Sequence, residues 1–180
     1  WYLKAAAGGN TEAMHHIGLF YANGYGVDRN FDTAITWWNK AAALGNGDAK
    51  KALKSLPALQ KAADGNDADA MDSVGTLYDS GEFGQVDYTQ AMKWFQKAST
   101  LGNAAATYHI GLLYVNGHGV PRDDAQAMTW YLKAADMGYA LAMENIGVFY
   151  AKGRGVPQDY AQAMQWYLKA ANGGNTEAMH

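Results

Sequence analysis

The sequence predicts an all-α solenoid of stacked helix pairs, and the spacing of two residue types supports this prediction. Five of the six tryptophans are spaced 36, 57, 36 and 36 residues apart: Trp1, Trp37, Trp94, Trp130 and Trp166. Five alanines follow with spacings of 57, 36, 36 and 36: Ala13, Ala70, Ala106, Ala142 and Ala178. A period of this size is typical of stacked supersecondary units. The 57-residue interval is one full period with a 21-residue remainder.

The first half of each unit predicts a helix. These segments are residues 13–24, 70–81, 106–117 and 142–153. Their Ala, Ile or Val, Leu or Phe, and Tyr recur at offsets 0, 4, 7 and 8, which form one stripe along a helix. A glycine follows each Ile or Val: Gly18, Gly75, Gly111 and Gly147. Because a glycine inside a helix costs about 1 kcal/mol, we expect another helix to cross closely there.

The second half of each unit predicts another helix, in residues 31–45, 88–102, 124–138 and 160–174. Its Ala, Met or Ile, Trp and paired Ala positions share one face. The Trp and the aromatic residue after it recur in phase, which favours a core role over sugar stacking. Glycines stand where a left-handed cap would end each helix: Gly45, Gly102, Gly138 and Gly173.

Gly-x-Gly turns connect the two helices of a unit. After each turn, an Asp or Asn precedes the second helix: Asn30, Asp87, Asp123 and Asp159. In three units a Gln follows three residues later, so we expect a capping box. One unit has Phe83 in place of the second glycine, which predicts a different turn.

A shortened unit near residues 46–66 breaks the period. Ala49 lies 36 residues after Ala13, so a first helix begins in phase, but Pro57 stands where Tyr21 stood. Lys61 replaces Lys40 only 21 residues on, so fifteen residues of loop and early second helix are missing. We expect a shortened helix pair with a sharp corner at residues 55–57. A decayed repeat and a purposeful hinge both fit this pattern.

The pattern A-x-x-x-[IV]-G-x-x-Y-x-x-G-x-G-V, followed by D-x-x-x-A-x-x-W-[YWF]-x-K-A, resembles the SEL-one-like repeat family, relatives of the tetratricopeptide repeat. The resemblance covers nearly all of residues 1–180, read as a single array of 36-residue units whose two ends lie mid-repeat. It implies a right-handed superhelix and a protein-interaction scaffold. Bacterial members often act in signalling, envelope assembly, host interaction or neutralising a toxic effector. The family favours a periplasmic or secreted location, and a cytoplasmic one stays open.

Composition excludes several classes. Half of the chain (49%) is apolar, 17% is charged and the net charge is −3, which indicates a globular protein without a nucleic-acid surface. No apolar run approaches the length of a membrane span. The unit phase leaves Trp1, Tyr2 and Leu3 bare at one end, and Ala178 and Met179 at the other. We interpret the chain as an excised part of a longer array, and end-to-end self-stacking is a possible consequence.

The sequence predicts no catalytic, metal or cofactor site. None of the four serines lies in a Gly-x-Ser-x-Gly or Ser-x-x-Lys motif: Ser55, Ser73, Ser80 and Ser99. His15 and His16 point about 100° apart on a helix, so they cannot chelate a metal together. The carboxylates on the first helices lack a neighbouring nucleophile. The alternatives are a hydrolase or penicillin-binding activity on the same solenoid, or an immunity-type protein.

The resemblance places the first helices on the concave face, where a protein or peptide partner would bind. A second stripe at offsets 2, 6 and 9 varies between units, and it predicts a partner-binding face: His15, Leu19, Asp72, Thr76, Asp79, Tyr108, Leu112, Val115, Glu144 and Val148. One interpretation is a peptide groove, apolar in its middle and flanked by acidic residues. The other is that neighbouring first helices pack these side chains together. A lysine cluster in the short unit is expected to be solvated: Lys50, Lys51, Lys54 and Lys61.

Overall fold

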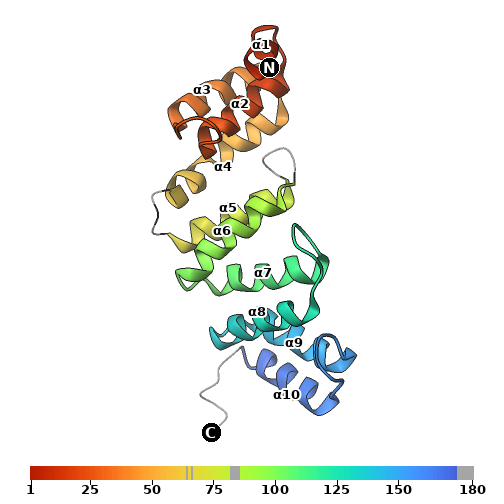
Figure 1. Ribbon diagram of the computed structural model, residues 1–180. Coiled ribbons are helices and arrows are strands. Elements are labelled where there is room, and N and C mark those ends of the chain that lie inside the picture. Colours follow the sequence, from red (N-terminus) through yellow and green to blue (C-terminus); the bar gives the residue numbers. More distant parts are fainter. Residues whose placement is uncertain (64, 66, 82–85, 174–180) are drawn as a thin grey trace.

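The computed structural model describes residues 1–63, 65, 67–81 and 86–173, and that part contains ten α-helices and no strand. The helices stack one after another into an elongated array (Figure 1). This confirms the predicted all-α, right-handed solenoid of helix pairs. The helices are α1 Tyr2–Ala7, α2 Thr11–Asn23, α3 Phe31–Ala43, α4 Gly47–Ala63, α5 Ala68–Ser80, α6 Tyr88–Thr100, α7 Ala104–Asn116, α8 Asp124–Asp136, α9 Ala140–Lys152 and α10 Tyr160–Ala171.

Four complete pairs form the array: α2 with α3, α5 with α6, α7 with α8, and α9 with α10. The glycine in the middle of each first helix faces an aromatic ring of the second. A Cβ added at Gly18 would lie 2.3 Å from Trp38 Nε1, and one added at Gly111 would lie 2.5 Å from Tyr131 Cε1. Gly75 and Gly147 meet Phe95 and Tyr167 in the same way. This confirms the predicted close helix crossing.

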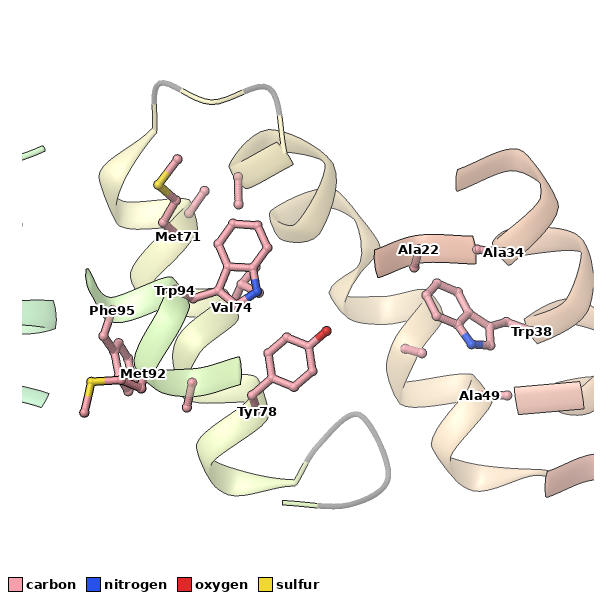
Figure 2. Close-up of a cluster of buried hydrophobic side chains, with 14 of the residues drawn as sticks. Ala22, Ala34, Trp38, Ala49, Met71, Val74, Tyr78, Met92, Trp94 and Phe95 are labelled. Carbon is pink, nitrogen blue, oxygen red and sulfur yellow. The ribbon is translucent and has the colours of Figure 1, made fainter. Parts of the chain in front are cut away.

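The ring that fills each pair is the one after the recurrent Trp, which refines the prediction that both rings belong to the core. Trp38 is fully buried, and Phe95 and Tyr131 are 2% and 1% exposed. Figure 2 shows Trp38 among small alanines, and Phe95 with Met92 in the next complete pair. The recurrent Trp lies farther out, below the ammonium of the Lys three residues later. The four Lys Nζ atoms lie 4.1–4.8 Å from the ring centroids: Lys40 on Trp37, Lys97 on Trp94, Lys133 on Trp130 and Lys169 on Trp166.

The predicted caps are present, but the capping box is not completed as expected. The Asp123 carboxylate accepts hydrogen bonds from the backbone N–H groups of α8, and Asn30, Asp87 and Asp159 cap their helices likewise. The backbone N–H of Asp123 donates to the carbonyl of Tyr114 at 3.0 Å, not to a Gln side chain. The glycines predicted to end the second helices have positive φ: Gly45, Gly102, Gly138 and Gly173. Phe83 lies outside the described residues.

Each later Gly-x-Gly turn reaches the previous unit. A Cβ added at Gly155 would lie 2.7 Å from the carbonyl carbon of Asp124 at the start of α8. The Arg154 guanidinium donates to the Asp124 carboxylate at 2.6 and 3.0 Å, and it holds the pKa of that carboxyl below its usual range. One unit earlier, His118 stacks on Tyr88 with ring centroids 4.1 Å apart. These turns are therefore part of the contact between units.

The short unit forms one helix, α4, and not the expected helix pair. Pro57 lies inside α4 and is exposed to solvent. The helix changes direction along its length (Figure 1), as a proline requires. Its buried Ala49, Ala52 and Ala62 lie on the side that contacts α3 and α5. A single helix therefore joins two complete pairs.

Both ends expose apolar side chains. Trp1, Tyr2 and Leu3 are exposed, and the Tyr2 ring also stacks on His16 with ring centroids 5.3 Å apart. Near the other end, Met164 and Leu168 of α10 are exposed. Ala178 and Met179 lie outside the described residues, so self-stacking through the ends stays a prediction.

We predict that Gly111→Ala destabilises the protein by about 1–3 kcal/mol, because the new methyl group overlaps the Tyr131 ring. Helix propensity alone would predict a gain of about 1 kcal/mol. Urea unfolding followed by circular dichroism measures the difference. Gly47→Ala is the control, because a Cβ there meets no described atom within 4 Å. Equal stability of the two variants would contradict the close crossing.

We predict that Gly155→Ala destabilises the array more than Gly26→Ala. Both glycines have φ near +65°, at 65° and 67°, so both variants strain the backbone. An added Cβ at Gly155 also meets the backbone of Asp124, whereas at Gly26 it meets no described atom within 4 Å. The difference between the two free energies of unfolding isolates the contact between units. A difference of zero would show that the turn does not hold the units together.

Candidate functional site

The residues predicted for the partner-binding face do not share one environment. Thr76 and Glu144 are exposed. Seven others are partly buried: Leu19, Asp72, Asp79, Tyr108, Leu112, Val115 and Val148. His15 is only 2% exposed, although it is one of the residues that line the groove described below. It lies beside the large Trp38 ring, whose Nε1 donates to the His15 carbonyl at 3.2 Å.

Several stripe residues join neighbouring units. The Asp72 carboxylate lies 2.9 Å from His109 Nδ1, and the Tyr108 hydroxyl accepts a hydrogen bond from Asn145 Nδ2 at 3.2 Å. In both cases a residue at offset 2 of one first helix meets the residue at offset 3 of the next. For this pair of positions, packing between first helices is therefore the correct interpretation.

Tyr108 is the centre of a small aromatic cluster. Its ring centroid lies 5.2 Å from that of Tyr139 and 5.5 Å from that of Tyr131. Burial raises the pKa of the Tyr108 hydroxyl, so the group stays neutral and donates or accepts hydrogen bonds at ordinary pH. Leu112 and Val115 pack against the same C-terminal core. These apolar side chains stabilise the last two complete pairs.

A hollow of about 530 Å³ lies at the other end of the stripe, and we call it the first-helix groove. Its walls include Glu12 and Leu19 of α2, Asp48 of α4, Tyr78 of α5, and Asp87 and Tyr88 at the start of α6. Three of these side chains are carboxylates, and none of the described residues that line the groove is Lys or Arg. Leu19 was predicted from the stripe, as was His15, which also lines the groove. The others were not, because α4 brings α2 close to α5 and α6.

The carboxylates of this groove differ in how far they are engaged. Asp87 caps α6, and its side chain accepts the backbone N–H of Gln90 at 3.0 Å. Asp48 lies 3.3 Å from Lys51 Nζ, a pair exposed to solvent and therefore weak. Glu12 is exposed at the rim. The groove therefore has a negative potential that a cationic group could enter.

Serine hydroxyls outside the groove form hydrogen bonds that stabilise the helices. The Ser73 and Ser80 hydroxyls donate to carbonyls of their own helix, and Ser99 pairs with Thr107 at 2.8 Å. In the described part of the chain, no three His, Asp or Glu side chains gather closely enough to hold a metal ion. No described helix has the length and apolarity to cross a membrane.

Known proteins resemble this chain at two scales. The Sel1 repeat matches residues 1–10, 11–46, 68–103, 104–139 and 140–175, and so leaves out the short unit. Short stretches match rat DAP3-binding cell death enhancer 1, at 36% identity over 56 residues, and the Saccharomyces cerevisiae chitin synthase regulator SKT5, at 45% over 56 residues. Each match covers 31% of this chain, and 11% and 8% of those proteins.

Solved structures match almost the whole chain. A protective antigen of uropathogenic Escherichia coli with an SLR fold is 31% identical, with a TM-score of 0.59, over 99% of this chain and 41% of that one. A Sel1 repeat protein from Oxalobacter formigenes is 35% identical, with a TM-score of 0.58, over 99% of this chain and 64% of that one. This chain therefore spans less than two thirds of either relative. With matched repeats over most of its length, the chain belongs to the Sel1 repeat family.

Proposed function

We propose that this chain is a non-enzymatic scaffold whose first-helix face binds a partner segment that carries basic side chains. Sel1 repeat proteins are generally protein-interaction scaffolds, which supports the class. The observation that carries the finer proposal is the first-helix groove, with carboxylates from Glu12, Asp48 and Asp87 and no described Lys or Arg. Opposite charge at a binding surface raises the association rate and excludes like-charged partners.

The groove suits a peptide segment more than a small molecule. It is an open hollow of about 530 Å³ whose polar rim surrounds apolar parts of Leu19, Tyr78 and Tyr88. Such a surface accepts a Lys or Arg whose aliphatic stem packs on the aromatic rings. The exposed Thr76 and Glu144 extend the same face toward α9, so a longer segment would meet a further carboxylate. The side chains beneath this face are the partly buried members of the stripe: Asp72, Tyr108, Leu112, Val115 and Val148.

The relatives' names agree with a role in binding, but they do not identify a partner. One relative is named as binding DAP3 and another as regulating chitin synthase, and this chain matches only a small part of either. No observation favours the alternatives of a hydrolase, a penicillin-binding activity or an immunity-type protein.

We predict that random 12-residue peptides displayed on phage and selected on this chain become enriched in Lys and Arg. Glu12→Lys and Asp48→Lys, tested singly, should each weaken the selected peptides at least about tenfold, because each variant places a cation in the groove. Fluorescence anisotropy with synthetic peptides measures the affinity.

Asp136→Lys is the matched control, because Asp136 is exposed at the end of α8 and makes the same change of charge. Equal weakening by Asp136→Lys would show a general charge effect and reject the groove. Selection of acidic or uncharged peptides would also reject it.

We predict that Tyr108→Ser lowers the free energy of unfolding by about 2–4 kcal/mol, because the ring packs within a core and bonds to Asn145. Glu144→Ser, at the same unit position in α9, should change it by less than about 0.5 kcal/mol because Glu144 is exposed. Thermal and urea unfolding measure both. If Tyr108→Ser leaves stability unchanged, Tyr108 is free to bind a partner and the proposed division of the stripe fails.

A further inference from the structure

The second helices α3, α6, α8 and α10 form the other side of the array, and this series is interrupted at the short unit. The fifteen residues missing there correspond to the loop and the first turns of a second helix. A hollow of about 420 Å³ lies between the start of α3 and α6. Arg29 and Phe31 line one side of it, and Lys93, Trp94 and Lys97 line the other. We call it the second-helix cleft.

The cleft continues along α6. A neighbouring hollow of about 280 Å³ shares Arg29, Trp94 and Lys97 with it and extends to Ala62 and Leu101. The first part lies between the α2–α3 turn with the start of α3 on one side and α6, from Gln90 to Thr100, on the other. This is where the early turns of the missing helix would lie. At the other end of the cleft lies Ala62 of α4, which belongs to the part of the short unit that remains.

The charges that line the cleft have one sign. Arg29, Lys93 and Lys97 line it, and none of the described residues around either hollow is Asp or Glu. The chain as a whole carries a net charge of −3, so this concentration of cations does not follow from composition. Two of the cations lie over aromatic rings: Arg29 is 5.8 Å from the Phe31 centroid, and Lys97 is 4.3 Å from that of Trp94.

A regular junction gives the comparison. The hollow between α6 and α8 contains one Trp and one charged side chain, Trp130 and Lys133, among Gln, Ser, Thr and Met residues. The second-helix cleft has three aromatic rings, Tyr25, Phe31 and Trp94, and three cations. The difference arises from the missing second helix. In a regular array that helix would lie next to the α2–α3 turn, whereas here residues of this turn face α6 directly.

We infer that the second-helix cleft binds an amphipathic helix of a partner protein, with one apolar stripe flanked by Asp and Glu. The apolar stripe would replace the missing turns against Tyr25 and Phe31, and the acidic side chains would pair with Arg29, Lys93 and Lys97. Helix-in-groove recognition uses this combination of an apolar anchor and charged flanks. The cleft shares Tyr25 with the first-helix groove but has the opposite charge and otherwise different lining residues, so the inference does not depend on the proposed function.

The test uses two fluorescein-labelled 16-residue designed helices with identical Leu and Ala stripes, one flanked by Glu and the other by Lys. Fluorescence anisotropy with the full chain should show binding of the Glu helix alone, weakening as salt rises. Lys93→Glu and Lys97→Glu should each weaken it at least about tenfold. Lys133→Glu is the control, because Lys133 holds the same unit position and covers Trp130 in the same way. Glu12→Lys, in the other groove, should leave the affinity unchanged.

Three results would overturn the inference. They are no binding of the Glu helix below a Kd of about 1 mM, equal binding of the Lys helix, or equal weakening by Lys133→Glu. Light scattering tests a second copy of the chain as the occupant. A mass that rises with concentration, and that Lys97→Glu but not Lys133→Glu suppresses, would assign the cleft to self-association and reject a partner helix.

Discussion

The contact between a glycine and an aromatic ring inside each helix pair is the constraint on which the rest of the array depends. A glycine in the middle of a helix costs about 1 kcal/mol, whereas burying a large aromatic side chain contributes about 1.5–3 kcal/mol. The exchange is favourable because the missing Cβ lets the ring reach the backbone of the first helix, as Trp38 does at Gly18. Burial of the ring also depends on the next unit. Tyr167 of α10 is 36% exposed, whereas Tyr131 of α8, followed by another pair, is 1% exposed.

Contacts between units are of a different kind. Besides the packing of each second helix on the next first helix, they include single polar pairs and turns that lie against helix ends, such as Asp72 with His109, and Arg154 with Asp124. Each polar pair fixes the order of the two units, because a residue at one position of a unit contacts a residue at a different position of the next unit. Stability in such an array is approximately a sum over units and neighbouring interfaces. A unit can therefore be shortened without unfolding the pairs on either side, provided that some helix still bridges them, as α4 does.

Repetition made most of the fold predictable, and it also set the limit of prediction. The helix predicted at residues 106–117 is observed as α7, Ala104–Asn116, because its stripe, its glycine and its cap all recur. The same repetition could not distinguish Trp130 from Tyr131, since the two rings always occur together, and the packing alone assigns Tyr131 to the contact with Gly111. The burial of His15 follows from the size of one ring, Trp38. Tyr108 pairs with Asn145 of the next unit, and the residue pattern of a single helix carries no information about such a contact.

The short unit is where prediction from periodicity ends and where both candidate surfaces arise. Tyr25, in the turn after α2, lines the acidic first-helix groove and the basic second-helix cleft alike. Burial raises the pKa of Tyr25 and of its neighbour Tyr78, so this boundary stays uncharged at ordinary pH. In a regular unit, a second helix would fill the gap beside Tyr25 and Phe31, whereas Trp94 is only 8% exposed even without it. Without that helix, the first-helix groove and the second-helix cleft each combine aromatic rings with charges of one sign. This composition is more typical of a binding surface than of a solvated surface.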